Sequence, residues 1–445
     1  MEISHLESLY PTQKYSTCDT KELDGLSNKR IDLTTHNIYT IDPPNCVDAD
    51  DGFSIKFTDN PDIFNLYVHI ADPTTYIEKY DIHFTNAQHN CVTQYPSMNP
   101  PRHMLPMGIV TQSSLMNGKK PAITIKYVIK DNKCVDRCLF FSYIYCDQKY
   151  KHTYESASEL IDHNDVISYS LKASTILSNE RNKKFSSLSD MGMSYVYFDE
   201  SSQSFKFKTY TEKVMILKNM IAELAIASNS YVAQLIHTFN NDYTFTRNCI
   251  DNGAKESSNA NDTLASIIKN GIRAKYDADN ISHDIVGSKL YTHFTSPIRR
   301  FSDIIVHFII KDIFTQQPSF TKDELIVLSN TINKKNKQIQ NIQRLESKYR
   351  LYQTIKQLVD NNDISVTIKY RFMSYSGLFV NLIIERVNEY NVYASYTIRC
   401  KPSLYIGKSF VENQIYSFRC TICNLPTNKF DTNVFPELEK EFVNM

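Results

Sequence analysis

The sequence lacks the features that would place a protein of this length in a membrane or outside the cell. Its 445 residues contain no apolar run that approaches the roughly 20 residues of a membrane-spanning helix, and they do not begin with a charged and then apolar leader. The ten cysteines are scattered and form no disulfide framework. We therefore expect a soluble protein of a reducing compartment, the cytoplasm, with no membrane association.

The formal net charge is zero, because 49 Lys and Arg residues balance 49 Asp and Glu residues. Nucleic-acid enzymes are often basic, so any case for RNA binding must rest on local clusters of charge. Glycine is scarce at 10 residues, a bias that we attribute to the coding genome rather than to the fold. Hydrophobic residues make up 42% and charged residues 22%, which is ordinary for a globular protein and argues against global disorder.

The residue pattern changes along the chain and divides it into regions. Residues 1–30 are polar and aperiodic and predict an arm that is either poorly ordered or wrapped around the fold. Short β-rich runs follow as far as about residue 141, at 37–41, 54–57, 66–70 and 122–129. Apolar residues at helical spacing then predict helices at 212–239, about 260–272, 298–314 and 322–360.

The pattern returns to strands after residues 360–363, where Asp-Asn-Asn-Asp breaks the last long helix. Strand candidates lie at 364–370, 378–384, 392–398 and 415–422, and such short strands at regular intervals suggest a small barrel. The sequence therefore predicts an α+β fold with an arm at 1–30, a large domain at 31–360 and a small β domain at 361–445.

Residues 40–55 hold the densest cluster of chemistry, with four carboxylates between two apolar strand-like runs: Asp42, Asp48, Asp50 and Asp51. Two like charges about 4 Å apart repel by roughly 4 kcal/mol at an effective dielectric near 20, so the cluster needs a counter-ion. Mg²⁺ takes one or two carboxylates together with phosphate oxygens and waters, which suits phosphodiester hydrolysis. A calcium loop fits less well, because the glutamate at its twelfth position and its central glycine are missing. An acidic surface loop remains the alternative.

A second cluster runs Tyr291-Thr-His-Phe-Thr-Ser-Pro-Ile-Arg-Arg-Phe-Ser-Asp303. Ser296 as N-cap and Pro297 as first helical residue predict a helix that begins there. Arg299 and Arg300 would then stand in its first turn, where the helix dipole favours acids, so we expect them to have a use. Two guanidinium groups beside free N–H groups bind phosphate well. The alternative is that both arginines only pair with Asp303 or with distant acids.

Together these segments resemble the catalytic domain shared by ribonuclease II and ribonuclease R, the RNB family. Its signatures run like T-I-D-x-x-x-A-x-D-x-D-D-A and Y-x-H-F-T-S-P-I-R-R-Y-x-D, from which this chain departs by Cys46, Gly52 and Phe301. Other stretches agree in order, among them Val68-His-Ile-Ala-Asp-Pro73, Met104-Leu-Pro106 and Ser282-His283. The resemblance covers about residues 30–355. It predicts an RNB catalytic domain in which helices surround a mixed β-sheet and form an RNA channel, here without the preceding cold-shock-type domains.

The resemblance implies a magnesium-dependent exoribonuclease that hydrolyses single-stranded RNA from the 3′ end to nucleoside 5′-monophosphates. The four aspartates would hold Mg²⁺ and the scissile phosphate, and loss of Asp50 would abolish cleavage without abolishing RNA binding. Arg299 would contact the phosphate near the scissile bond, and Arg300 would be a second basic contact. Glu223 would lie near the ribose of the last nucleotide, although the residue pattern alone indicates a solvated helix position.

The remaining site residues concern the substrate. Tyr95 is the candidate to stack on the terminal base, because Tyr95-Pro96 precedes Met104 as in the family, with a spacing one residue longer. Ser296 would contact the strand beside the two arginines. We expect a monomer acting on single-stranded RNA.

A late helix contributes two further candidates, Glu346 and Lys348. Glu346 matches a functional acid of the family, and an ion pair with Arg350 one turn later is the alternative. Lys348 belongs to a base-rich stretch at 334–356, which is either a solvated helix face or a source of salt-dependent RNA affinity.

The C-terminal region resembles the OB-type RNA-binding barrel of the family in degenerate form, with its best match at 376–380. Phe372, Tyr375 and Phe379 could stack on bases or form the barrel core. Two other functions stay open. One is a catalytically weak or inactive RNB-fold RNA-binding protein that acts with a partner, against which the four retained aspartates argue. The other is a metal-dependent phosphatase acting on small substrates.

Overall fold

The computed structural model describes residues 3–17, 21–60, 62–181, 194–239, 244–255, 263, 266–267, 270–316, 318–361, 366–376, 379–392, 398–400, 415–420 and 438–443. A mixed five-stranded sheet with the order β1-β6-β5-β4-β3 forms the centre of the larger part. Its strands are β1 (Ile31–Leu33), β3 (Asp51–Phe57), β4 (Ile63–Ala71), β5 (Gly118–Lys130) and β6 (Lys133–Cys146). β1 runs parallel to β6, and the other neighbours are antiparallel.

Side chains on β4 and β5 are buried on both faces, so the sheet is covered on both sides. α5 (Asp165–Asn179) packs on β3 and β6 and against α6 (Glu212–Phe239), which in turn contacts α8 (Phe301–Thr315). The predicted helix at 212–239 is confirmed, and Leu217, Met220 and Leu224 form its buried stripe. Among the described residues, no helix is both long and apolar enough to cross a membrane.

α8 corrects one prediction, because it begins at Phe301 and not at Pro297. Residues 299–301 pair instead with the chain after α2 (Ile82–Asn90): Thr93 N donates to Arg299 O at 2.9 Å, and Phe301 N donates to Cys91 O at 2.9 Å. This pairing holds Arg300 in an extended conformation, with φ −134° and ψ 125°. A contact distant in sequence therefore overrides the local capping signal.

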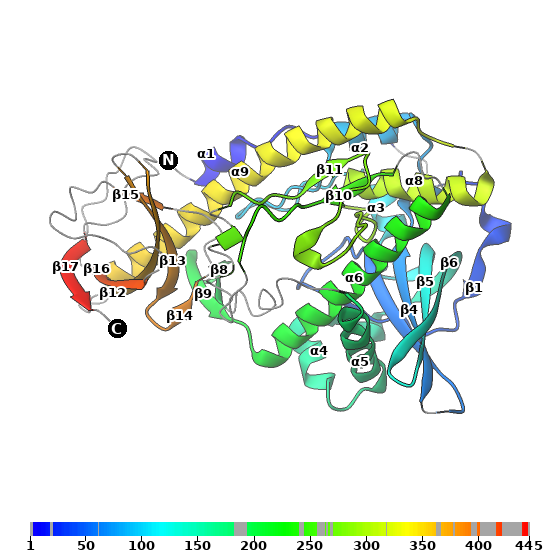
Figure 1. Ribbon diagram of the computed structural model, residues 1–445, viewed down its shortest axis with the longest axis horizontal. Helices are drawn as coiled ribbons and strands as arrows, with labels where there is room; N and C mark the ends of the chain where they lie inside the picture. The colour runs from blue at the N-terminus through cyan, green and yellow to red at the C-terminus, as the bar shows by residue number, and fades with distance from the viewer. Residues whose placement is uncertain are drawn as a thin grey trace.

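α9 (Lys322–Asn361) is the longest helix and runs along the molecule from the end near α8 to the C-terminal sheet (Figure 1). Its 40 residues span about 60 Å at 1.5 Å per residue. Shorter elements beside it include the hairpin of β8 (Ser194–Asp199) and β9 (Ser204–Thr209) and the pair β10 (Thr246–Asn248) and β11 (Lys275–Asp277). The helix predicted at about 260–272 lies mostly outside the described residues.

The C-terminal strands form a separate sheet with the order β14-β13-β12-β16-β17, in which β15 pairs with β13. Their bounds are β12 (Val366–Ser376), β13 (Phe379–Val387), β14 (Tyr390–Asn391), β15 (Ile398–Cys400), β16 (Ile415–Cys420) and β17 (Leu438–Val443). Phe372 is buried, which corresponds to the core alternative rather than to a stacking platform. The side chains of Tyr375 and Phe379 lie outside the described part.

The N-terminal segment is packed against the rest of the fold where it is described. α1 (Ile3–Ser8) lies against α9, as Figure 1 shows. Further on, Arg30 and Lys311 make a buried ion network with two carboxylates, those of Asp24 and Asp72. Of the two alternatives for the arm, the wrapped one corresponds to these contacts.

Candidate active site

Two segments that lie 249 residues apart in the chain meet at Asp50. The Asp50 carboxylate accepts a hydrogen bond from the backbone N–H of Ile298 at 2.7 Å and one from Arg299 Nε at 2.9 Å. The Asp50 residue is 3% exposed, whereas the Arg299 side chain is 46% exposed. Burial raises the pKa of Asp50, while Arg299 and the Ile298 N–H oppose that shift. The carboxylate therefore fixes a guanidinium group that still reaches solvent.

The backbone of the acidic loop is held from the side of α3 (Met107–Ser113). Ala49 N donates to Ser114 Oγ at 3.0 Å, and Leu115 N donates to Ala49 O at 3.0 Å. Ala71 N, at the end of β4, donates to Asp50 O at 2.8 Å. Because hydrogen bonds hold the backbone on both sides, the position of Asp50 is fixed by the neighbouring sheet and not left to a free loop.

Ser296 and Arg300 have structural partners. Arg299 Nη2 donates to Ser296 Oγ at 2.9 Å, so Ser296 orients the arginine instead of capping a helix. Asp303, in the first turn of α8, accepts from Ser296 N at 2.8 Å and from Arg300 Nη2 at 2.7 Å. The first turn of α8 therefore contains Asp303, an acid that the helix dipole favours there, and neither arginine. The expectation that Arg299 and Arg300 oppose the helix dipole was wrong. Both arginines make the pairs that the alternative described, Arg300 with Asp303 and Arg299 with the distant Asp50.

Asp48 lies in a small polar cluster with Tyr95, His103 and Cys46. Tyr95 Oη donates to Asp48 Oδ2 at 3.0 Å, His103 Nδ1 lies 3.5 Å from the same oxygen, and Cys46 Sγ lies 3.6 Å from Oδ1. Burial alone would raise the pKa of Asp48, but His103 and Tyr95 hold it below its usual range. The structure therefore places Tyr95 at the acidic loop, despite the longer spacing in sequence.

Asp42 and Asp51 are two carboxylates of the acidic loop whose charges interact. Asp42 ends β2 (Thr40–Asp42), and burial together with the charge of Asp51 raises the pKa of Asp42 to about 7. Its Oδ2 atom is buried and has no hydrogen-bond partner. Burial also raises the pKa of Asp51, while the charges of Arg299 and Arg300 oppose that shift. An orphaned carboxylate oxygen beside a second, partly buried carboxylate fits a hard divalent cation. In the described part of the chain, however, no three His, Cys, Asp or Glu side chains are already arranged around a metal position.

Glu223 lies on α6 and forms an ion pair with Arg181, which follows α5. The Arg181 side chain is largely buried, and Arg181 Nη1 donates to Val286 O at 2.8 Å. The solvated position that the residue pattern indicated for Glu223 is therefore wrong. Its partner comes from a remote segment that the pattern of α6 could not show.

Glu346 is buried on α9 and bonds to two segments from the other end of the chain. Tyr10 Oη donates to Glu346 Oε2 at 2.6 Å, and Ser97 N donates to Glu346 Oε1 at 3.4 Å. Burial raises the pKa of Glu346, and the charge of Arg350 opposes that shift. Lys348 is partly buried on the same helix.

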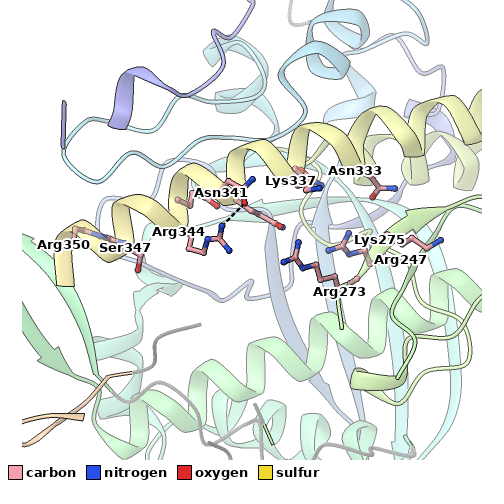
Figure 2. A pocket seen from close by; sticks show the side chains of 13 residues that line it. Arg247, Arg273, Lys275, Asn333, Lys337, Asn341, Arg344, Ser347 and Arg350 are labelled. Carbon is pink, nitrogen blue, oxygen red and sulfur yellow. Dashed lines mark hydrogen bonds between the residues drawn. The ribbon is translucent and has the colours of Figure 1, made fainter. Parts of the chain in front are cut away.

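A polar cavity of about 890 Å³ lies between α9 and the β10–β11 pair. Figure 2 shows Lys337, Asn341 and Arg344 on α9, with Arg247 and Arg273 on the opposite side. Its lining residues in the described chain include six Lys or Arg and no Asp or Glu: Arg247, Arg273, Ala274, Lys275, Asn333, Asn336, Lys337, Gln340, Asn341, Gln343, Arg344, Ser347 and Arg350. The base-rich stretch of α9 thus supplies one wall of a basic cavity.

Two aromatic rings connect this cavity to the arginine segment. The Arg247 guanidinium lies 4.6 Å from the centre of the Tyr276 ring. Tyr276 Oη in turn lies 2.6 Å from His293 Nδ1 and accepts from Ser302 Oγ at 2.9 Å. Burial and the charges of Arg300 and Arg247 lower the pKa of His293 well below its ordinary value. Neither Tyr276 nor His103 was a sequence candidate, since each owes its place to contacts distant in sequence.

Comparison with known proteins agrees with this geometry. The family model described as "RNB domain" matches residues 30–272 and 250–316, which is more than half of the chain. The chain therefore belongs to the RNB family. Ribonuclease R of Mycoplasma genitalium is 25% identical over 374 residues, covering 72% of this chain and 51% of that protein. Exoribonuclease 2 of Proteus mirabilis is 25% identical over 337 residues, covering 64% and 51%. The chain spans about half the length of these two relatives.

Solved structures share the fold. Mycoplasma genitalium RNase R in complex with ribose-methylated single-stranded RNA superimposes with a TM-score of 0.72 at 17% identity, covering 95% of this chain and 73% of that chain. Yeast Ssd1, described as a pseudonuclease, superimposes with a TM-score of 0.69 at 16% identity, covering 88% and 53%. The RNB fold predicted from the two motifs is confirmed.

Proposed function

We propose that this protein is a magnesium-dependent exoribonuclease that hydrolyses single-stranded RNA from its 3′ end and releases nucleoside 5′-monophosphates. The observation that carries the proposal is the junction at Asp50, where the acidic loop and the arginine segment of an RNB-family chain meet through Ile298 and Arg299. Such a junction brings anionic ligands for a cation and a guanidinium for a phosphate to one place.

Arg299 is the residue that we assign to the phosphate. Asp50 engages its Nε atom and Ser296 engages Nη2, so the orientation of the guanidinium is set before substrate arrives. Because 46% of the side chain is exposed, it can still donate to an anion from solvent. A preorganised donor of this kind offsets the charge that develops on the attacked phosphate. Asp50 and Ser296 then act by holding Arg299, and Arg300 acts by holding the segment through Asp303.

Asp42 and Asp51 are the residues that would hold Mg²⁺ most directly, because one oxygen of Asp42 has no hydrogen-bond partner and the charge of Asp51 acts on the same carboxylate. Bound there, the metal would activate water and neutralise charge on the phosphate. Asp48 would serve the site through Tyr95, whose hydroxyl it holds at 3.0 Å. Tyr95 is 43% exposed, so part of its surface remains open to the terminal base.

The basic cavity would bind the strand upstream of the cut. Six cationic side chains neutralise phosphates without reading sequence, and the amides on α9 can bond to sugars or to base edges. Glu346 and Lys348 lie on the same helix, and Glu223 would contact the substrate only alongside its partner Arg181. In this proposal the protein acts as a monomer on single-stranded RNA in the cytoplasm.

Product analysis tests this proposal. Uniformly labelled RNA incubated with the protein and Mg²⁺ should yield nucleoside 5′-monophosphates, at a rate independent of added inorganic phosphate. Circular RNA of the same sequence should resist, because it offers no 3′ end. Nucleoside diphosphates as products would show phosphorolysis. Cleavage of the circle would show an endonuclease, and turnover of mononucleotides with RNA left intact would show a phosphatase.

A second function stays in view, namely RNA binding without cleavage. The observation that favours it is that both oxygens of Asp50 are already bonded to the protein, while no three metal-binding side chains are preassembled in the described chain. The structural neighbour Ssd1, described as a pseudonuclease, has the same fold. Retained RNA binding with intact RNA at every Mg²⁺ concentration would establish this second function.

A further inference from the structure

The loop that carries Tyr95 lies between α2 and α3, and we call residues 91–104 the tyrosine loop. It reaches the active site through Tyr95 Oη on Asp48 at 3.0 Å, through His103 Nδ1 at 3.5 Å from the same carboxylate, and through Thr93 N on Arg299 O at 2.9 Å. It folds back on itself where Gln94 and Arg102 pair in antiparallel fashion. The loop has no helix or long strand of its own, so its shape depends on what packs against its outer side.

Residues 3–17 of the arm supply that outer support, beginning with Glu7. Glu7 is 2% exposed, and its carboxylate accepts from Met98 N at 2.7 Å and from the Asn99 side-chain amide. Arg102 Nη2 approaches the backbone oxygen of Glu7 at 3.5 Å. A buried carboxylate thus binds the tip of the tyrosine loop, three residues after Tyr95.

Tyr10 gives a second attachment through Glu346. The Tyr10 hydroxyl donates to Glu346 Oε2 at 2.6 Å, and the other oxygen of the same carboxylate accepts from Ser97 N at 3.4 Å. The Arg102 guanidinium lies 6.0 Å from the centre of the Tyr10 ring. The arm, the long helix α9 and the tyrosine loop therefore join at one buried carboxylate, two residues from Tyr95.

The rest of the arm follows both sides of the loop. Gln94 Nε2 donates to Pro11 O at 2.9 Å, and Gln13 Nε2 donates to Val92 O at 3.0 Å. Tyr15 Oη donates to His103 O at 2.5 Å, so the residue that lies beside Asp48 is held from outside as well. None of these arm residues bonds to the active-site aspartates, so the arm can act there only through the loop.

We infer that residues 3–17 are a positioning element for Tyr95, and that they set where the 3′-terminal nucleotide stops and hence how short the final RNA product becomes. The inference rests on the proposed function. Its physical basis is that a stacking aromatic works only at a fixed distance from the attacked phosphate, and a displacement of about 1 Å can cost roughly a hundredfold in rate. The arm fixes that distance by closing the loop against α9.

Product length and the affinity for RNA test this inference. Glu7→Ala and Tyr10→Phe should each raise the KM for single-stranded RNA by about tenfold, the equivalent of one base stack. Each should also leave a final product at least one nucleotide longer than that of the parent. Glu7→Gln should stay near the parent, because its side-chain oxygen still accepts from Met98 N and the Asn99 amide can turn its own oxygen toward the new NH₂ group. Unfolding midpoints would show that all variants remain folded.

A matched control separates positioning from stability. The Tyr143 hydroxyl donates to Glu22 Oε2 at 2.6 Å, so Tyr143→Phe also removes a tyrosine-to-carboxylate bond to the N-terminal segment, but on β6 and away from the loop. This variant should keep the product length of the parent. If it lengthens the product as Tyr10→Phe does, the effect is general loosening and the inference is wrong.

A binding measurement keeps the inference testable without cleavage. RNA with 2-aminopurine as its 3′-terminal base should be quenched when it binds to the Asp50→Asn protein, and less so when Tyr10→Phe or Glu7→Ala is added. If the parent never cuts RNA but Tyr10→Phe or Glu7→Ala still reduces the quenching, the proposed activity is refuted while the role of the arm is supported. Unchanged product length and unchanged quenching in folded Tyr10→Phe protein would overturn the inference, even if Glu7→Ala failed to fold.

Discussion

Replacing Asp50 by asparagine removes one negative charge at the junction of the two motifs. The asparagine oxygen can still accept from Ile298 N, but its NH₂ group would then face Arg299 Nε, donor against donor. The guanidinium would lose its anchor and turn toward solvent, which it can do because 46% of the side chain is exposed. We therefore expect the substitution to act through the position of Arg299 as well as through the lost charge.

The size of the effect follows from these contacts. A hydrogen bond to a charged group contributes roughly 1.5–3 kcal/mol, and solvation of the released arginine returns part of it, so unfolding should become easier by only about 1–2 kcal/mol. Loss of a preorganised donor costs about 3–4 kcal/mol of barrier. Together with the lost carboxylate, we expect cleavage at least about a thousandfold slower, or roughly 4 kcal/mol.

Single-turnover cleavage, equilibrium RNA binding and urea denaturation measure the three quantities separately. The Asp50→Asn protein should bind single-stranded RNA within about threefold of the parent, since one buried residue contributes little to strand affinity. Asp81→Asn, which changes an aspartate that accepts from Phe84 N at the start of α2, is a matched control and should cut normally. Comparable cleavage by the parent and Asp50→Asn would refute the role assigned to this carboxylate.

Three further predictions concern Arg299, the basic cavity and a buried histidine. Arg299→Ala should lower the cleavage rate more than the affinity for RNA. Arg299→Lys should recover little of the rate, because lysine cannot engage both Asp50 and Ser296. A loss of affinity with no loss of rate would place Arg299 in the RNA channel instead of the active site. Arg273→Gln and Lys337→Gln should each reduce the slope of log K for RNA binding against log salt concentration by about 0.7. The control Lys133→Gln, on β6, should leave this slope unchanged. Equal slopes for all three variants would show that RNA does not bind in the cavity. Burial lowers the pKa of His69 to about 3, so the folded state resists a proton that the unfolded chain accepts near pH 6.5. Stability should therefore fall as the pH drops from about 6.5 toward 3, by up to roughly 4 kcal/mol, and His69→Gln should flatten that part of the profile in denaturation experiments.

Local signals in the sequence located the two motifs but not their contact. The acidic loop and the arginine segment each stood out by composition, yet only the family resemblance joined them, because a bond such as Asp50 to Arg299 has no local signature. Where a local rule was applied alone it failed: Ser296 and Pro297 are good helix-starting residues, but pairing with the tyrosine loop holds Arg300 in an extended conformation.

The helix at 212–239 was predictable because its apolar stripe repeats over many turns. The partners of its polar residues were not. Glu223 bonds to Arg181 from a segment before it, and Glu346 bonds to Tyr10 from the far end of the chain. The hydrophobic periodicity of a helix predicts that both acids lie on the surface, because it does not show burial by a segment that is remote in the sequence. The support that the arm gives to Tyr95 was hidden for the same reason.

The measurement that tests the central claim most directly is a time course on 5′-labelled single-stranded RNA and the matching DNA, with Mg²⁺ or with chelator. The account predicts that only RNA shortens, only with Mg²⁺, and stepwise from the 3′ end toward a short labelled product. RNA that stays intact under every condition while still binding the protein would contradict it and would identify the chain as a binding member of the RNB family.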